Sequence, residues 1–134
     1  MITVPFLFIS KQSSFTDGKL TVHDMFDVHY FKPEEVLLEN CIVTFGILAD
    51  REDDQTELEF RIVSKEVHNL NIKIPFNFTY KNDNRITVHN YGIASLPILK
   101  NETIRFEIWN NNNLLNTYPV SFIKEKNEDG DADA

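Results

Sequence analysis

From Leu70 to Tyr80 the chain alternates between large apolar side chains and a second set that is polar except for Pro75. A period of two places successive side chains on opposite faces of a strand, whereas an amphipathic helix repeats about every 3.6 residues. This segment is therefore predicted to be a β-strand with one buried face. The same period recurs along most of the chain and limits it to folds built from sheets. The apolar members are Leu70, Ile72, Ile74, Phe76, Phe78 and Tyr80.

The segment just before this strand alternates in the same way, with its apolar side chains again at even-numbered positions from Leu58 to Ile62, followed by Ser64. Two antiparallel strands place these sets on one face only if paired residue numbers have an even sum. A sum near 136 predicts a hairpin whose loop runs from Val67 to Asn69, with Asn69 in the left-handed conformation.

Two further hairpins are predicted. The alternating strand from Cys41 to Ala49 is expected to pair with the Leu58 strand through an acidic connection. The strands 104–108 and 118–122 are expected to pair across the turn Asn110–Asn113. Pro119 lies on the outward side of its strand and indicates a sheet edge, because proline has no N–H to donate.

Strands are also predicted over residues 4–10, 20–25 and 85–89. About eight short strands separated by turns indicate an all-β fold, a sandwich or a small barrel, and we predict an antiparallel β-sandwich. One short helical turn is expected after Pro33, because proline followed by two glutamates suits a helix start. Residues 1–123 are predicted to form a single domain.

Charge is unevenly distributed along the chain. The 134 residues include 21 acidic and 13 basic side chains, for a formal net charge of −8. Between Asp50 and Glu59 six acidic residues accompany one arginine, and from Lys124 to Ala134 five accompany two lysines. The stretch 124–134 has no large apolar side chain and is predicted to be a disordered acidic tail. An acidic protein is poorly suited to a phosphate backbone, so we expect no nucleic-acid partner.

The apolar runs of this chain are short. None approaches the roughly 18 apolar residues that a transmembrane helix needs, so we expect no membrane partner. Cys41 is the single cysteine and cannot form a disulfide within the chain. Both observations are typical of a protein from a reducing compartment, and a cytoplasmic location is predicted.

Several short motifs carry a family resemblance. They are the turn Thr16–Leu20, the pair Phe26-Asp27 and the closing segment Leu115–Phe122. Together with the opening strand they resemble an uncharacterised bacterial β-sandwich family in which a Gly-Lys-Leu turn precedes a Phe-Asp pair. The resemblance covers most of residues 3–123. It implies a β-sandwich and no known activity.

Catalysis has two candidate groups of residues. Cys41 lies on the apolar side of its predicted strand, which favours a buried structural thiol over a nucleophile. A second group, His23, Asp24, Asp27 and His29, could support a metal-dependent hydrolase. On one continuous strand, however, His23 and His29 would lie about 20 Å apart, too far to share a metal ion. We therefore expect no catalytic residue, no metal site and no cofactor.

Two parts of the sequence, the acidic connection and Trp109, are candidate binding sites. The acidic connection could recognise a basic surface or supply oxygen ligands to Ca²⁺, although it lacks the helix-flanked calcium-loop pattern and is most simply a solvated loop. Trp109 shares its parity with Arg105 and Glu107, which places it outside the core, where tryptophan often marks a contact. Tyr30, Phe31 and Tyr91 could join it in a surface patch. The candidate binding residues are Asp50, Glu52, Asp53, Asp54, Glu57 and Trp109.

Three functional classes remain open. The leading hypothesis is a non-enzymatic protein-binding or accessory β-sandwich, acting with a protein partner or as a homo-oligomer, because it requires no missing motif. A carbohydrate or small-ligand binding module using Trp109 and the Asn-rich loops is the alternative. A metal-dependent hydrolase built on His23, Asp27 and the acidic connection is the third.

Overall fold

The computed structural model describes residues 1–53, 55–64, 70–80, 86–98 and 100–125. Within this part of the chain nearly all regular structure is β-strand, and the helical exception is a 3₁₀ turn at Arg51–Asp53. The strands, in chain order, are β1 (Thr3–Thr16), β2 (Lys19–Met25), β3 (Val28–Phe31), β4 (Leu37–Leu48), β5 (Thr56–Val63), β6 (Asn71–Phe78), β7 (Thr87–Pro97), β8 (Glu102–Asn110) and β9 (Asn113–Lys124).

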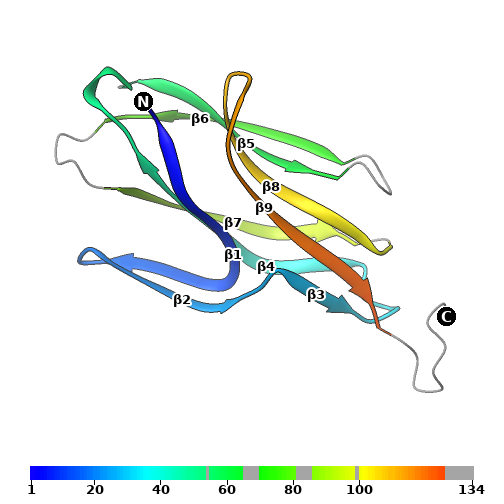
Figure 1. The fold of residues 1–134 in the computed structure, drawn as a ribbon. Coiled ribbons are helices and arrows are strands. Elements are labelled where there is room, and N and C mark those ends of the chain that lie inside the picture. The colour runs from blue at the N-terminus through cyan, green and yellow to red at the C-terminus, as the bar shows by residue number, and fades with distance from the viewer. Residues whose placement is uncertain (54, 65–69, 81–85, 99, 126–134) are drawn as a thin grey trace.

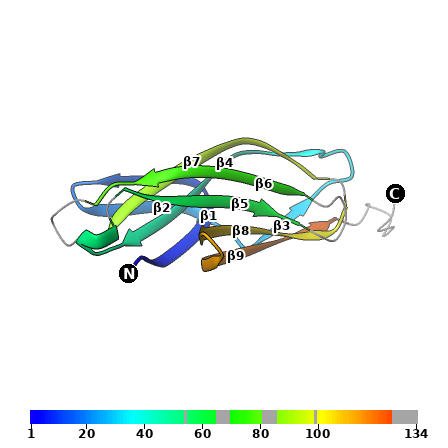
Figure 2. The same ribbon diagram turned by 90° about the horizontal axis from the view of Figure 1, so that it is seen from above.

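The strands form two sheets that pack face to face (Figure 1). The four-stranded sheet has the order β2-β1-β4-β7, and the five-stranded sheet has the order β3-β9-β8-β5-β6. Every neighbouring pair is antiparallel except β3 and β9, which run parallel. In Figure 2, which is turned by 90°, β6, β5, β8 and β9 follow one another across the five-stranded sheet. The predicted all-β sandwich is confirmed.

The core lies between the two inner faces. Phe45 of β4, Phe60 of β5 and Phe106 of β8 are each at most 1% exposed. Full burial of a side chain of this size contributes roughly 1.5–3 kcal/mol relative to leaving it in water. The predicted alternation accounts for the inward positions, which are Cys41, Val43, Phe45 and Ile47 in β4, Leu58, Phe60 and Ile62 in β5, Ile104, Phe106 and Ile108 in β8, and Val120 and Phe122 in β9.

The connection from β4 to β5 is not the hairpin that the sequence predicts. β4 belongs to the four-stranded sheet and β5 to the five-stranded sheet, so the acidic connection crosses from one sheet to the other. Alternation identifies the apolar side of a strand, but the inner faces of both sheets of a sandwich are apolar. The same pattern therefore fits a hairpin and a crossing equally well.

The other two predicted hairpins are present. β8 pairs with β9 across the turn Asn110–Asn113, as predicted. β5 pairs with β6 in a different register, because Leu58 pairs with Phe76 and Val63 with Asn71, so paired numbers sum to 134 rather than 136. The parity is right, since the apolar sets of both strands lie on one face, but the hairpin is centred one residue earlier. The predicted loop 67–69, with Asn69, lies outside the described residues.

Two local expectations need correction. The segment after Pro33 is a turn, closed by a hydrogen bond from Glu35 N to the Lys32 carbonyl at 2.9 Å, and not a helix. Pro119 is not in an edge strand, because β9 lies between β3 and β8. Its missing donor is nevertheless harmless, since β3 pairs with β9 only from Ser121 onward.

The domain boundary also differs from the sequence prediction. β9 extends to Lys124, and the backbone N–H of Glu125 donates to the carbonyl of Phe31 at 2.8 Å. The predicted disordered tail therefore includes two residues that belong to the folded domain. The remainder, residues 126–134, lies outside the described residues.

The outer face of the four-stranded sheet is partly covered by its own side chains. Gly46 of β4 faces outward, and a Cβ atom there would lie 2.6 Å from both Ile86 and the Phe6 ring. Thr44 Oγ1 lies 2.7 Å from Asn90 Oδ1 and 2.9 Å from Ser13 Oγ, which joins three strands of this sheet. Side chains thus close the surface around Gly46 and Thr44, whereas Ile42 and Gly92 further along the same strands line an open hollow.

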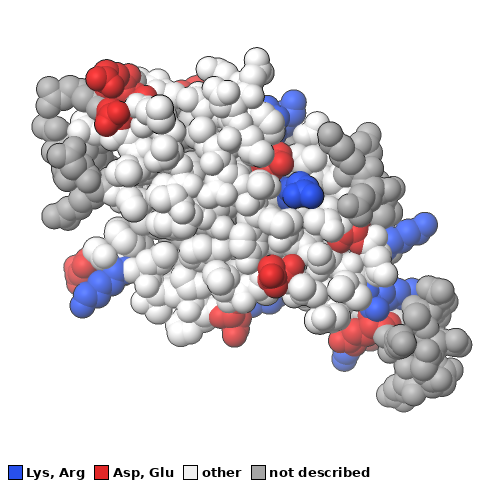
Figure 3. Space-filling model, viewed as in Figure 1, with Lys and Arg blue, Asp and Glu red and all other residues white. Residues whose placement is uncertain are grey.

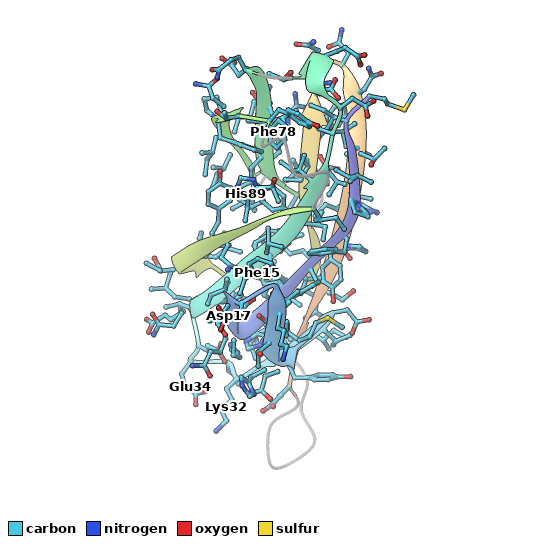
Figure 4. All side chains as sticks on the ribbon, turned by 90° about the vertical axis from the view of Figure 1, so that its left-hand side faces the viewer. Phe15, Asp17, Lys32, Glu34, Phe78 and His89 are labelled. Atoms are coloured by element: carbon cyan, nitrogen blue, oxygen red, sulfur yellow. The ribbon has the colours of Figure 1, made fainter. Side chains whose placement is uncertain are left out.

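Strand β1 bends where it leaves β4 and continues as a hairpin with β2 (Figure 1). The turn of this hairpin is Asp17-Gly18, both with positive φ, as the sequence motif Asp-Gly favours. Figure 4 shows Phe15 and Asp17 near its tip, in the lower half of that view, and Phe78 of the other sheet in the upper half. In Figure 1 the tip of this hairpin and the end of β3 lie on opposite sides of the molecule.

Candidate functional site

The outer face of the five-stranded sheet carries an open groove built from three adjacent strands. β5, β6 and β8 lie side by side there (Figure 2), and the register sets Arg61 opposite both Glu107 and Lys73. The groove encloses about 590 Å³. We call it the Trp109 groove. It is lined by Arg61, Val63, Ser64, Asn71, Lys73, Thr103, Arg105, Glu107 and Trp109.

Trp109 is held in place by polar contacts on this face. Its Nε1 donates a hydrogen bond to Glu107 Oε1 at 3.0 Å, and the Arg61 guanidinium lies over its ring at 4.2 Å from the centroid. Arg61 Nε in turn pairs with the Glu59 carboxylate. Both ion-pair partners are less than one third exposed, at 22% and 30%. The indole is therefore fixed in orientation, and one of its faces is already covered by a cation.

Two further cations border the groove. Lys73 of β6 and Arg105 of β8 are both exposed. Neither takes part in a hydrogen bond or an ion pair within the described part of the chain. Glu107, which follows Arg105 on β8 and lies across β5 from Lys73, is only 9% exposed and accepts the Trp109 hydrogen bond. Among the described residues, the groove therefore presents these two cations to solvent.

The acidic connection binds the start of the chain. The Met1 ammonium lies 2.8 Å from Asp50 Oδ2 and 2.9 Å from Asp53 Oδ2. Hydrogen bonds from this ammonium to the carboxylates, Asp50 first, raise the pKa of the Met1 amine to about 10 from 8.0. Partial desolvation acts to raise the pKa of the Asp53 carboxyl, but the backbone N–H of Asp50 and the Met1 ammonium outweigh it and hold that pKa below its ordinary value.

The predicted acidic binding residues are thus divided between different environments. Asp50 and Asp53 pair with Met1, while Glu52 and Glu57 are exposed. Glu57 points outward from β5, on the same face as Glu59, and Asp54 lies outside the described residues. Figure 3 shows acidic side chains gathered at the upper left, where the amino-terminus lies. None of these acidic residues is among the described residues that line the Trp109 groove.

The residues considered for catalysis are not brought together. His23 is in β2 of one sheet and His29 is in β3 of the other, where its Nε2 lies 2.8 Å from Glu35 Oε2. Cys41 is 1% exposed, and burial raises the pKa of its thiol, as expected for a structural cysteine. No group of three or more His, Cys, Asp or Glu side chains in the described ranges could hold a metal ion.

The predicted aromatic patch around Trp109 is wrong. Phe31 is 2% exposed and belongs to the core. Tyr91 of β7 points inward and packs against Phe45 and Phe60, at ring centroid distances of 5.6 and 5.5 Å. Tyr30 is 60% exposed but lies on β3, outside the groove. Trp109 itself is outside the core, as its parity predicts.

The sequence prediction missed most of the groove. Arg105 and Glu107 could be predicted from the sequence as neighbours of Trp109, because they share its parity on one strand. Arg61 and Lys73 come from two other strands, and only the pairing β6-β5-β8 places them beside the indole. No local motif signals that neighbourhood.

Comparison with known proteins gives no assignment, because no protein-family model matches this chain and no curated protein matches it. The family resemblance therefore stays a prediction. Among the described residues, none forms a helix of the length and apolar character needed to cross a membrane.

Proposed function

We propose that this protein is a non-enzymatic accessory protein that binds another protein through the outer face of its five-stranded sheet. The observation that carries the proposal is the fixed Trp109 side chain, with Arg61 over its ring and Glu107 on its Nε1. Tryptophan and arginine are enriched among the residues that dominate interface energies. Side chains already held in one orientation lose less entropy when a partner binds.

The two sheet faces differ in a way that supports this choice. The four-stranded sheet is covered around Gly46 by Phe6 and Ile86, and its hollow at Ile42 and Gly92 is lined by no aromatic side chain of the described residues, whereas the five-stranded sheet presents the Trp109 groove. A second copy of the chain is one partner class, and a different protein is the other. We place the protein in the cytoplasm, where its single cysteine needs no disulfide partner.

The carbohydrate alternative rests on the same tryptophan. Sugars stack on an open aromatic face, and the Arg61 guanidinium covers one face of Trp109 at 4.2 Å. This contact favours a protein partner over a sugar. Quenching of the intrinsic tryptophan fluorescence by simple sugars would instead support the carbohydrate alternative.

Site-specific photo-crosslinking tests the proposal. A photoreactive amino acid replaces Thr103 in the groove, or Thr21 on β2 of the other sheet as the matched control, and each protein is exposed to an extract of its native host. We expect a distinct crosslinked protein from position 103 and not from position 21. Crosslinking only from position 21, equal labelling at both positions or no crosslink from position 103 would contradict the proposal.

A further inference from the structure

The Trp109 groove has the opposite charge to the protein that carries it. Its lining includes three basic side chains, Arg61, Lys73 and Arg105, and one carboxylate, Glu107, and with the Glu59 carboxylate that pairs with Arg61 the net charge is +1. The whole chain has a net charge of −8. A local reversal of sign on a binding surface selects partners of complementary charge.

The two carboxylates at the groove are committed to neighbours, whereas two of the cations are not, and the exposed Glu57 of the same face lies outside the groove lining. Glu107 accepts the Trp109 hydrogen bond and Glu59 pairs with Arg61. Arg105 and Lys73 have no such partner within the described residues and are exposed. The groove therefore meets an incoming ligand with one guanidinium and one ammonium group.

The spacing of these two cations suits an extended peptide. Arg105 and Lys73 lie on β8 and β6, with β5 between them, and Arg105 pairs with Val63, two residues along β5 from the Arg61 that pairs with Lys73. Neighbouring strands are about 4.8 Å apart and two residues span about 7 Å, so the two Cα positions are about 12 Å apart, and long side chains can shorten the gap between the charges. Carboxylates on alternate residues of an extended chain are about 7 Å apart. Both acidic groups of such a chain can therefore reach a cation at once.

We propose that the Trp109 groove binds an acidic, extended polypeptide segment of the partner, with carboxylates paired to Arg105 and Lys73. This inference rests on the proposed function, because it names the chemistry of the protein that the outer face receives. Arg105 supplies a planar fork that matches a carboxylate, and Lys73 supplies a compact charge. Asn71 and Thr103, which also line the groove, supply polar groups for the peptide backbone.

A fluorescence anisotropy titration tests the inference with a short labelled peptide in which Glu alternates with Ser. The matched peptide has Gln at each Glu position. We expect the Glu peptide to bind and the Gln peptide to bind at least about fivefold more weakly, as loss of two ion pairs predicts. Equal affinity for the two peptides, or no binding of either, would overturn the inference.

Charge-neutralising variants locate the site. The double variant Arg105→Gln with Lys73→Gln should weaken binding of the Glu peptide by about fivefold to tenfold. Lys19→Gln removes an equally exposed cation from the β1–β2 hairpin and should change affinity less than about twofold. An equal loss from Lys19→Gln and from the double variant would show that general charge, and not the groove, attracts the peptide.

A competition arm separates a polypeptide from a small anion. Inorganic phosphate at the ionic strength of a matched chloride control should displace the Glu peptide no better than chloride does. Displacement by phosphate alone would show a small-anion site and would overturn the inference. Failure of the peptide to bind while position 103 still crosslinks a partner would remove only the acidic chemistry and would leave the proposed function standing.

Discussion

Replacing Gly46 by alanine should destabilise the domain, and the reason is visible in one set of contacts. The added Cβ atom would lie 2.6 Å from Ile86 Cγ2, 2.6 Å from Phe6 Cε1 and 2.7 Å from Phe6 Cζ. Ordinary contacts between carbon atoms begin near about 3.5 Å. Both neighbours must therefore rotate or move by about 1 Å, as in an overpacked core.

The magnitude follows from two opposing effects. Overpacking costs about 1–3 kcal/mol. Alanine also restricts the unfolded chain, which offsets about 0.4–1 kcal/mol where the backbone conformation suits it, and Gly46 does not have a positive φ. We expect a net loss of about 1–2 kcal/mol. For a domain of this size that loss lowers the melting temperature by about 3–10 °C, which differential scanning calorimetry resolves easily.

Gly92→Ala is the matched control, because Gly92 lies in the neighbouring strand β7 and a Cβ atom there would meet nothing within 4 Å. It should leave the melting temperature unchanged or raise it slightly. Phe6→Leu in the Gly46→Ala background should recover part of the loss by shortening the ring that the new methyl group meets. A Gly46→Ala variant as stable as the parent, or an equal loss from Gly92→Ala, would refute the close packing of Phe6 and Ile86 over this sheet.

Three other measurements follow from the structure. The Asp50 and Asp53 carboxylates raise the pKa of the Met1 amine to about 10. The protonated amine therefore stabilises the fold fully below pH 8 and loses that effect as the pH rises to about 10. Amino-terminal acetylation should lower the melting temperature at pH 7 and not at pH 11. A double-mutant cycle between Arg61→Gln and Trp109→Leu should give a coupling of about 0.5–1 kcal/mol in urea unfolding, and additive effects would contradict the stacked geometry. Truncation after residue 125 should leave the melting temperature unchanged. Truncation after residue 123 removes the backbone donors of residues 124 and 125 and should lower the free energy of unfolding by about 1–2 kcal/mol. Equal melting temperatures for the two truncated proteins would refute the docking of these residues.

The sequence predicts the faces of strands better than their neighbours. The alternation around Phe60 and Phe76 correctly assigns both to the core side, and the odd parity of Trp109 correctly places it outside. Parity depends only on the period of the strand, which is local. The sequence predicts the β5–β6 pairing with the right parity, but its predicted register differs from the observed one. Several registers keep both apolar sets on one face, so parity alone does not select one of them.

The candidate site was predictable only along β8, where Arg105 and Glu107 share the parity of Trp109. Trp109 stands out by its parity, but the cations that make its surroundings distinctive include those of strands β5 and β6. Their proximity depends on which sheet each strand joins, and the apolar pattern of β4 and β5 fits either arrangement. The acidic connection was conspicuous in sequence, yet Asp50 and Asp53 turn out to hold Met1.

The edge strand β6 carries Pro75 in its middle, paired opposite Glu59 of β5. The β5–β6 ladder continues on both sides of this pair, so the donor that proline lacks falls on the free edge. A strand from another molecule that tried to extend the sheet would meet a gap in the row of N–H groups and, beside it, the charge of Lys73. The protein can thus present a broad sheet face to a partner while its open edge resists the strand-by-strand stacking from which fibrils grow.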